Sequence, residues 1–181
     1  MRIACWVSLL LAATGACTGT PRGSDLAPAA EAFVAGGRTE GGRTLLELRV
    51  GDDHRSVMLE RDDTVAPETA PDSIETVAKV RGAAIVIIDT YRSRAGGMSY
   101  CQAGEERFLR VISTVGQGAT VRYGAKVGSC LHNLELADPG VVWDATTATL
   151  HVHWLLGPNG KEDERTIAVR PDGRAEAVPA R

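Results

Sequence analysis

The sequence lacks the local motifs that mark most enzymes. It contains no Gly-x-Ser-x-Gly elbow, no His-Glu-x-x-His helix and no glycine loop of the kind that cradles phosphate. Its carboxylates include no pair that stands out as a general acid and base. These absences predict a protein that is not an enzyme.

Aromatic residues are also scarce, and the basic residues are scattered along the chain. Aromatic side chains make up 4% of the 181 residues, and the formal net charge at pH 7 is −3. Proteins that bind nucleic acid need a concentrated basic face, and those that bind single strands usually add aromatic stacking platforms. The composition therefore argues against a nucleic-acid partner.

The N-terminal apolar run is too short to be a permanent membrane span. Met1 and Arg2 form a short positive region, and residues 3–13 are apolar apart from Ser8. This run has about the length of a signal-peptide core, whereas a membrane-spanning helix needs roughly 20 residues. Residues 1–16 are therefore predicted to be a signal peptide that is removed on export.

Residues 13–17 read Ala-Thr-Gly-Ala-Cys and resemble the lipobox of bacterial lipoproteins, with Thr14 where leucine is commonest. The resemblance implies cleavage before Cys17 and a membrane anchor of more than one acyl chain on that cysteine, which holds a protein durably. Thr18 follows instead of aspartate, which resembles outer-membrane sorting, facing the periplasm, in a Gram-negative host. The alternative is an ordinary secretory signal cut near Ala16.

Cysteine use agrees with export. Cys5 leaves with the signal peptide, so Cys101 and Cys130 remain as one pair in an oxidising compartment. Such a pair predicts a disulfide. The alternatives are two free thiols or a metal pair, and the sequence has no Cys-x-x-Cys spacing to favour a metal.

Residues 17–42 are predicted to be the lipidated cysteine and a flexible tether. The stretch is rich in Gly, Ala, Pro, Thr and Ser, which bury too little apolar surface to offset their ordering entropy. A short helix at residues 29–35 is the alternative for part of it. Residues 43–181 are predicted to form a single β-domain.

Alternating apolar residues and regularly spaced turn signals predict the fold class of this domain. Residues 84–88 form a short apolar run, which indicates a central strand buried on both faces. Residues 130–136 are expected to be extended, with His132 toward the core, and to end at a turn at residues 138–140. The prediction is a mainly β protein: an antiparallel β-sandwich or partly open barrel with one disulfide.

His151 and His153 are the sharpest candidate for chemistry. A His-x-His pair on a strand places both rings on one face, an arrangement that can hold zinc or copper. A third ligand would have to come from elsewhere in the fold, and the candidates are His54, His132, Asp144 and Glu164. The alternative is a solvent-facing strand surface without metal.

The segment around Cys101 is a candidate recognition loop. Its candidate partner-binding residues are Tyr100, Gln102, Glu105 and Glu106. A disulfide-held loop presents side chains rigidly to a protein partner; the alternative is a structural staple. The leading functional prediction is an envelope-anchored, non-enzymatic protein-binding module of the inhibitor, immunity or accessory type. The alternatives are a metal-binding envelope lipoprotein and a purely structural one.

Overall fold

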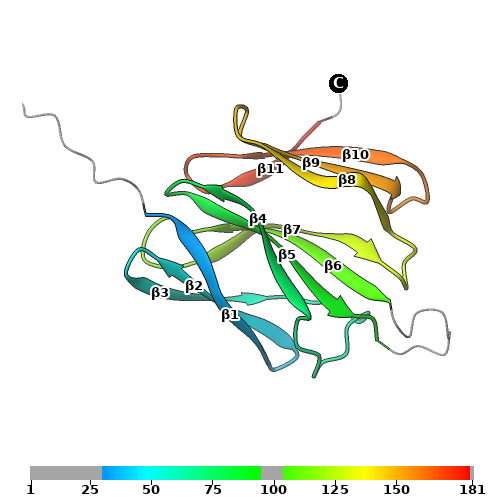
Figure 1. Cartoon of the computed structure of the whole chain (residues 1–181), viewed down its shortest axis with the longest axis horizontal. Coiled ribbons are helices and arrows are strands. Elements are labelled where there is room, and N and C mark those ends of the chain that lie inside the picture. Colours follow the sequence, from blue (N-terminus) through cyan, green and yellow to red (C-terminus); the bar gives the residue numbers. More distant parts are fainter. Residues whose placement is uncertain (1–29, 95–103, 180–181) are drawn as a thin grey trace, which may run out of the picture.

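The computed structural model describes residues 30–94 and 104–179, and over these residues the chain forms β-strands and no helix. The strands make three antiparallel sheets stacked as layers (Figure 1). In each sheet, strands that follow one another in sequence pair with one another. The first sheet contains β1 (Ala32–Glu40), β2 (Arg43–Val50) and β3 (Asp53–Leu59); the central sheet β4 (Ser73–Val80), β5 (Ala84–Arg92), β6 (Glu105–Ser113) and β7 (Thr120–Ser129); and the third sheet β8 (Glu135–Asp144), β9 (Thr149–Leu156), β10 (Asp163–Val169) and β11 (Ala175–Val178).

The central sheet is covered on both faces. Successive residues of a strand point to opposite faces; in β5, Ala84 and Val86 pack toward the third sheet while Ile85 and Ile87 pack toward the first. The covering sheets complete the two cores with Leu150, Val152, Trp154, Ile167 and Val169 on one side and Leu46, Leu48, Val50 and Leu59 on the other. The prediction of a central strand buried on both faces is confirmed.

The mainly β, antiparallel class is confirmed as well. Of the two architectures predicted, the sandwich is the one that forms, because every sheet keeps two end strands and none closes into a barrel. The sandwich has three layers rather than two.

The predicted tether is wrong for its last part, because residues 32–40 form β1. Gly41 and Gly42 have φ angles of 57° and 76°, the positive values that a two-residue hairpin turn between β1 and β2 requires. Ala32 and Val34 face the core beside Leu48. The Gly-Gly turn was the local signal for this hairpin, and among the described residues the first strand begins at Ala32 instead of residue 43.

The expectation for residues 130–140 is wrong in two respects. Residues 130–133 form a turn, which leaves His132 exposed rather than near the core. Asp138, Pro139 and Gly140 do not end the segment but lie within β8, where they belong to a bulge opposite β9.

Buried polar side chains line the face of the central sheet that points to the first sheet. Asp89 and Arg110 form an ion pair of 3.2 Å there, and both are more than nine-tenths buried. The Tyr91 hydroxyl donates to Asp89 Oδ2 over 2.9 Å and lies 2.7 Å from Thr44 Oγ1. Arg110 Nη2 donates to the backbone carbonyl of Glu60. These bonds join β2 and the end of β3 to the central sheet.

A second buried ion pair connects β6 and β7. Glu106 is fully buried, and its Oε2 accepts a 3.0 Å hydrogen bond from Lys126 Nζ. The same ammonium lies 2.6 Å from Asp62 Oδ2 in the loop between β3 and β4. Ser93 Oγ donates to Glu106 Oε1 over 2.7 Å. Each of these charges has a partner, as burial demands, and the pairs fasten the β3–β4 loop to the central sheet.

The two carboxylates that hold Lys126 have lowered pKa values. Burial by itself raises the pKa of Glu106, but hydrogen bonds from Ser129, Ser93 and Lys126 outweigh it and bring the pKa below its ordinary value of 4.5. Burial also raises the pKa of Asp62, and the opposing interactions, led by the hydrogen bond with Lys126, bring it below 3.8. Stability from such groups is present above their ordinary pKa and is lost as the pH falls through the folded-state pKa.

We therefore expect Glu106→Gln to lower the free energy of unfolding at pH 7 by about 3 kcal/mol, because Lys126 loses one of its two carboxylate partners in a buried site. The loss of stability below pH 4.5 should also become shallower than in the parent protein. Urea unfolding at pH 7 and at steps down to pH 3 measures both effects.

Glu47→Gln is the matched control, since Glu47 lies on the half-exposed outer face of the first sheet and should leave the pH profile unchanged. Burial raises the pKa of Asp89, so protonation of Asp89 at low pH favours the folded state, in contrast to protonation of Glu106 and Asp62. Asp89 is present in the parent and in both variants, so it does not affect their comparison. An unchanged acid profile in Glu106→Gln would contradict the assignment.

Candidate functional site

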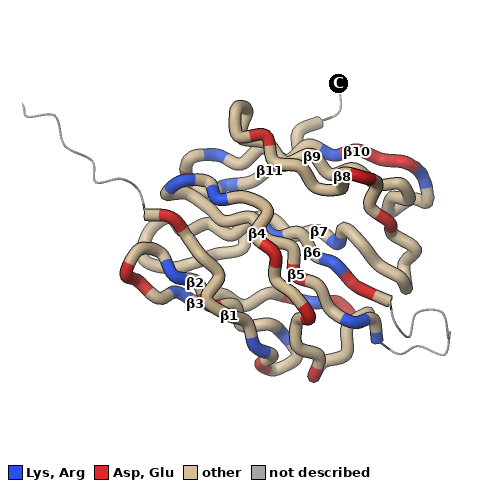
Figure 2. The backbone as a smooth tube through the Cα atoms, viewed as in Figure 1, with Lys and Arg blue, Asp and Glu red and all other residues tan. Residues whose placement is uncertain are grey.

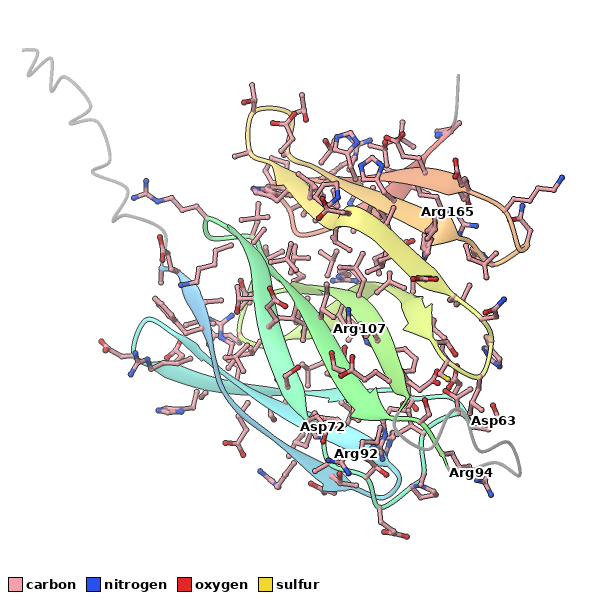
Figure 3. The ribbon with its side chains drawn as sticks, turned by 45° about the vertical axis from the view of Figure 1, so that its right-hand side comes forward. Asp63, Asp72, Arg92, Arg94, Arg107 and Arg165 are labelled. Carbon is pink, nitrogen blue, oxygen red and sulfur yellow. The ribbon has the colours of Figure 1, made fainter. Side chains whose placement is uncertain are left out.

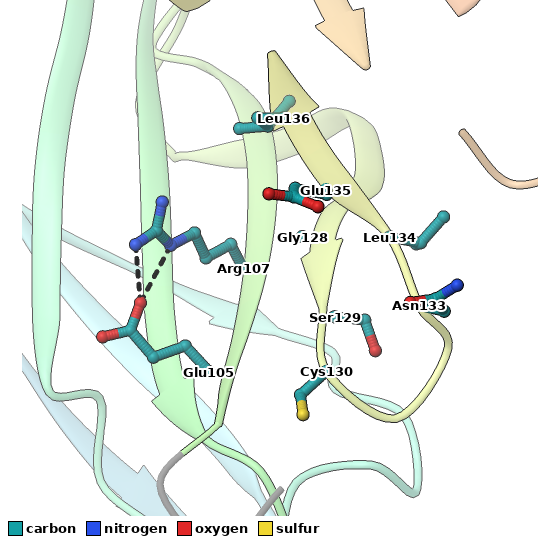
Figure 4. A pocket seen from close by; sticks show the side chains of 9 residues that line it. All are labelled: Glu105, Arg107, Gly128, Ser129, Cys130, Asn133, Leu134, Glu135 and Leu136. Carbon is teal, nitrogen blue, oxygen red and sulfur yellow. Dashed lines mark hydrogen bonds and ion pairs between the residues drawn. The ribbon is translucent and has the colours of Figure 1, made fainter. Parts of the chain in front are cut away.

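Two adjoining open hollows lie between the central sheet and the third sheet. Their volumes are about 490 Å³ and 780 Å³. Arg107 and Leu136 line both of them, so the hollows are treated together as the interlayer groove. Residues of β6, β7 and β8 line the smaller hollow (Figure 4), and residues of β4, β5, β6 and β8 line the larger one.

A bulge in β8 shapes one wall of the groove. Leu136 pairs with Trp154 and the next pair joins Val141 to Val152, so residues 137–140 stand outside the ladder. Gly140 has a φ of 77°, a conformation that glycine adopts readily. A bulge bends its strand and redirects its side chains, and residues 137–140 accordingly line the larger hollow.

The groove has an apolar floor. Five of its lining side chains are half-buried and pack against the core between the central and third sheets: Val77, Ile88, Leu136, Val141 and Trp143. Apolar surface that remains partly open beside a core is suited to contact with another macromolecule.

Arg107 lies on the face of the central sheet that points to the third sheet (Figure 3). Strand alternation in β6 places it on the same face as Leu109. A Cβ atom on Gly128 would meet the stem of Arg107 at 3.4 Å, so this glycine leaves room for the arginine beside β7. Arg107 Nε and Nη2 donate to Glu105 Oε2 over 3.1 Å and 2.6 Å (Figure 4). Both side chains are about half exposed, so the pair adds little stability and stays accessible to a ligand.

The four predicted partner-binding residues do not share one location in the structure. Glu105 lines the groove, and its role as a partner contact stays a prediction. The prediction that Glu106 contacts a partner is wrong. Strand alternation turns its side chain to the face of the central sheet that points to the first sheet, where it is fully buried and bound to Lys126 and Ser93. Tyr100 and Gln102 lie outside the described residues.

Cys130 lines the smaller hollow. Its predicted partner Cys101 lies outside the described residues, so the bridge stays a prediction. Gly104 packs closely here: a Cβ atom at this position would lie 2.5 Å from Cys130 Cβ and 2.8 Å from its Sγ. Gly104 therefore lies directly against Cys130.

The two histidines lie on the outer face of the third sheet, away from the groove. The His151 and His153 ring centroids are 6.4 Å apart and the rings are nearly parallel, at 19°. Of the four candidate third ligands, Glu164 is the one brought to the pair: its two carboxylate oxygens lie 3.5 Å from His151 Nδ1 and 3.9 Å from His153 Nδ1. Within residues 30–94 and 104–179, no group of three such side chains is arranged to hold a metal ion, and the metal hypothesis stays a prediction.

The predicted lipidation site Cys17 and the predicted signal peptide also lie outside the described residues, so both stay predictions. Across the part of the chain that is described, no helix combines the length and apolar character needed to cross a bilayer.

Sequence reasoning missed Arg107, Leu136 and Trp143 as neighbours in one site. Arg107 comes from β6 of the central sheet, whereas Leu136 and Trp143 come from β8 of the third sheet, and no short motif joins them. Trp143 offered the one local hint, because a large aromatic side chain in a chain with few aromatics often marks a contact surface.

No protein family, curated protein or solved structure matches this chain.

The close approach of Gly104 to Cys130 predicts that Gly104→Ala destabilises the domain. The added methyl group meets a side chain that is held in place, and overpacking of this kind typically costs about 1–3 kcal/mol. Thermal unfolding should show a lower Tm than the parent. Gly118→Ala is the control, since nothing lies within 4 Å of a Cβ there, and an equal effect of the two substitutions would contradict the prediction.

Proposed function

We propose that the protein is a lipoprotein of the bacterial cell envelope whose β-domain binds a protein partner through the interlayer groove, without catalysing a reaction. Its role is that of an inhibitor, an immunity factor or an accessory subunit of an envelope assembly. A purely structural envelope lipoprotein is the competing function, and it requires no discrete partner.

The observation that carries the proposal is the make-up of the groove. Half-buried apolar side chains, including Leu136 and Trp143, form its floor, and charged side chains such as Arg107 and Glu105 stand beside them. Protein interfaces have this anatomy, with an apolar centre and a polar rim, and they favour Trp and Arg as energetic anchors. The hollows are open rather than enclosed, which suits a segment of a macromolecule better than a small ligand.

The envelope location rests on the lipobox resemblance at residues 13–17. Fourteen residues separate Cys17 from the start of β1 at Ala32. A chain of that length reaches at most about 50 Å when fully extended. An anchored domain therefore stays close to the membrane, where its partner must also be found.

The proposal includes a disulfide between Cys101 and Cys130. Export to an oxidising compartment and the close packing of Gly104 on Cys130 support it. The bridge would hold the segment before β6 against the turn after β7, beside the smaller hollow of the groove.

Replacing the lipobox cysteine tests the anchor. Cys17→Ser should abolish incorporation of labelled fatty acid and leave the precursor uncut or release the protein from the membrane, because the serine hydroxyl does not replace the thiol in this processing. Metabolic labelling followed by membrane fractionation measures both. Unchanged lipid labelling in the variant would show that Cys17 is not the anchor.

Blocking the groove tests the binding function. Ala137 lines the larger hollow, so Ala137→Tyr should reduce partner capture at least tenfold by filling it. Ala145→Tyr places the same side chain on the exposed turn between β8 and β9 and should leave capture unchanged. The assay is in-cell cross-linking of the tagged, full-length protein, followed by mass spectrometry.

One dominant partner, captured by the parent and by Ala145→Tyr, is the expected outcome. Equal capture by Ala137→Tyr would remove the groove from the binding function. A diffuse set of abundant envelope proteins in all three samples would favour the structural role.

A further inference from the structure

The interlayer groove concentrates negative charge, whereas the chain as a whole is nearly balanced, with 23 acidic and 20 basic residues. Over the described chain, basic and acidic residues are intermixed (Figure 2). The groove is different: among its lining residues Arg107 is the single cation, and the anions are Glu75, Glu105, Glu135 and Asp138.

Arg107 does not neutralise this excess. Its Nε and Nη2 groups already bind Glu105, which leaves Glu75, Glu135 and Asp138. All three are exposed, and none makes an ion pair with another residue of the described ranges 30–94 and 104–179. Three uncompensated carboxylates therefore border the apolar floor.

The backbone around the larger hollow favours an extended ligand. β4 is the end strand of the central sheet and β8 is the end strand of the third sheet, and both line this hollow. End strands carry N–H and C=O groups that the ladder leaves unpaired, and a chain segment in extended conformation can bind to them. Alternate side chains of such a segment point in opposite directions, so one set can reach the apolar floor while the other faces the rim.

We infer that the groove binds an extended segment of the partner in which Lys or Arg side chains alternate with apolar ones. The apolar side chains contact Ile88, Leu136 and Trp143, and the cations lie beside Glu75, Glu135 and Asp138. This inference rests on the proposed protein-binding function and specifies the chemistry of the partner. Charge complementarity of this kind selects the partner and speeds its association.

The test uses a fluorescent, end-capped octapeptide in which lysine alternates with valine, titrated against the full-length protein in nonionic detergent and followed by fluorescence anisotropy. The matched probe has glutamate in place of every lysine. We expect the glutamate peptide to bind at least tenfold more weakly, and we expect added salt to weaken binding of the lysine peptide, because exposed charges are screened.

A triple variant identifies the site. Glu75→Gln, Glu135→Gln and Asp138→Asn together should weaken binding of the lysine peptide about tenfold. The control neutralises three exposed acids outside the groove with Asp52→Asn, Asp63→Asn and Glu68→Gln, and we expect a change of less than twofold. Equal weakening by the two sets, or none by the groove set, would overturn the inference.

Cross-linking in cells separates this inference from the function on which it rests. If Ala137→Tyr loses the partner and the groove triple variant also loses it, both stand. If the triple variant retains the partner while Ala137→Tyr loses it, the groove binds without charge complementarity and the inference alone is wrong. If Ala137→Tyr retains the partner, the proposed binding site fails and the inference fails with it.

Discussion

Burial of β5 and β6 on both faces is the constraint on which the rest of this structure depends. A strand with two apolar faces needs a cover on each, and here the first and third sheets supply the covers with one apolar face apiece. The outer sheets in turn have no other surface on which to bury their apolar side chains. Three thin antiparallel sheets thus become one domain with two cores.

Two-sided burial also determines how the chain handles charge inside the fold. The face that points to the first sheet changes from apolar to polar along β5, from Ile87 to Asp89 and Tyr91. Because a buried charge is costly without a partner, Asp89 and Glu106 are matched by Arg110 and Lys126. Arg110 and Lys126 also bind Glu60 and Asp62 at the start of the β3–β4 loop. The two ion pairs therefore hold the first sheet in place in addition to neutralising buried charge.

The groove follows from the way in which the third sheet covers the central one. Where β8 is regular, its residues help to close the core; where residues 137–140 bulge, apolar side chains such as Ile88 and Leu136 remain half open. The groove therefore combines an apolar floor with an irregular wall. If the groove binds as inferred above, its acidic rim attracts cationic segments and repels anionic ones.

Local patterns in the sequence determined the strands, since alternation in β2 and β9 and the apolar run in β5 reflect side-chain directions that each strand fixes by itself. They indicated Glu105 and Glu106 alike as candidate partner contacts, without distinguishing the two. Tertiary structure alone decided that the sheets number three, and that Glu106 is buried while Glu105 is not. It also brought Glu75, Arg107 and Leu136 into one groove. The physical reason is that these features depend on packing between sheets, which joins residues far apart in the chain and leaves no short-range signal.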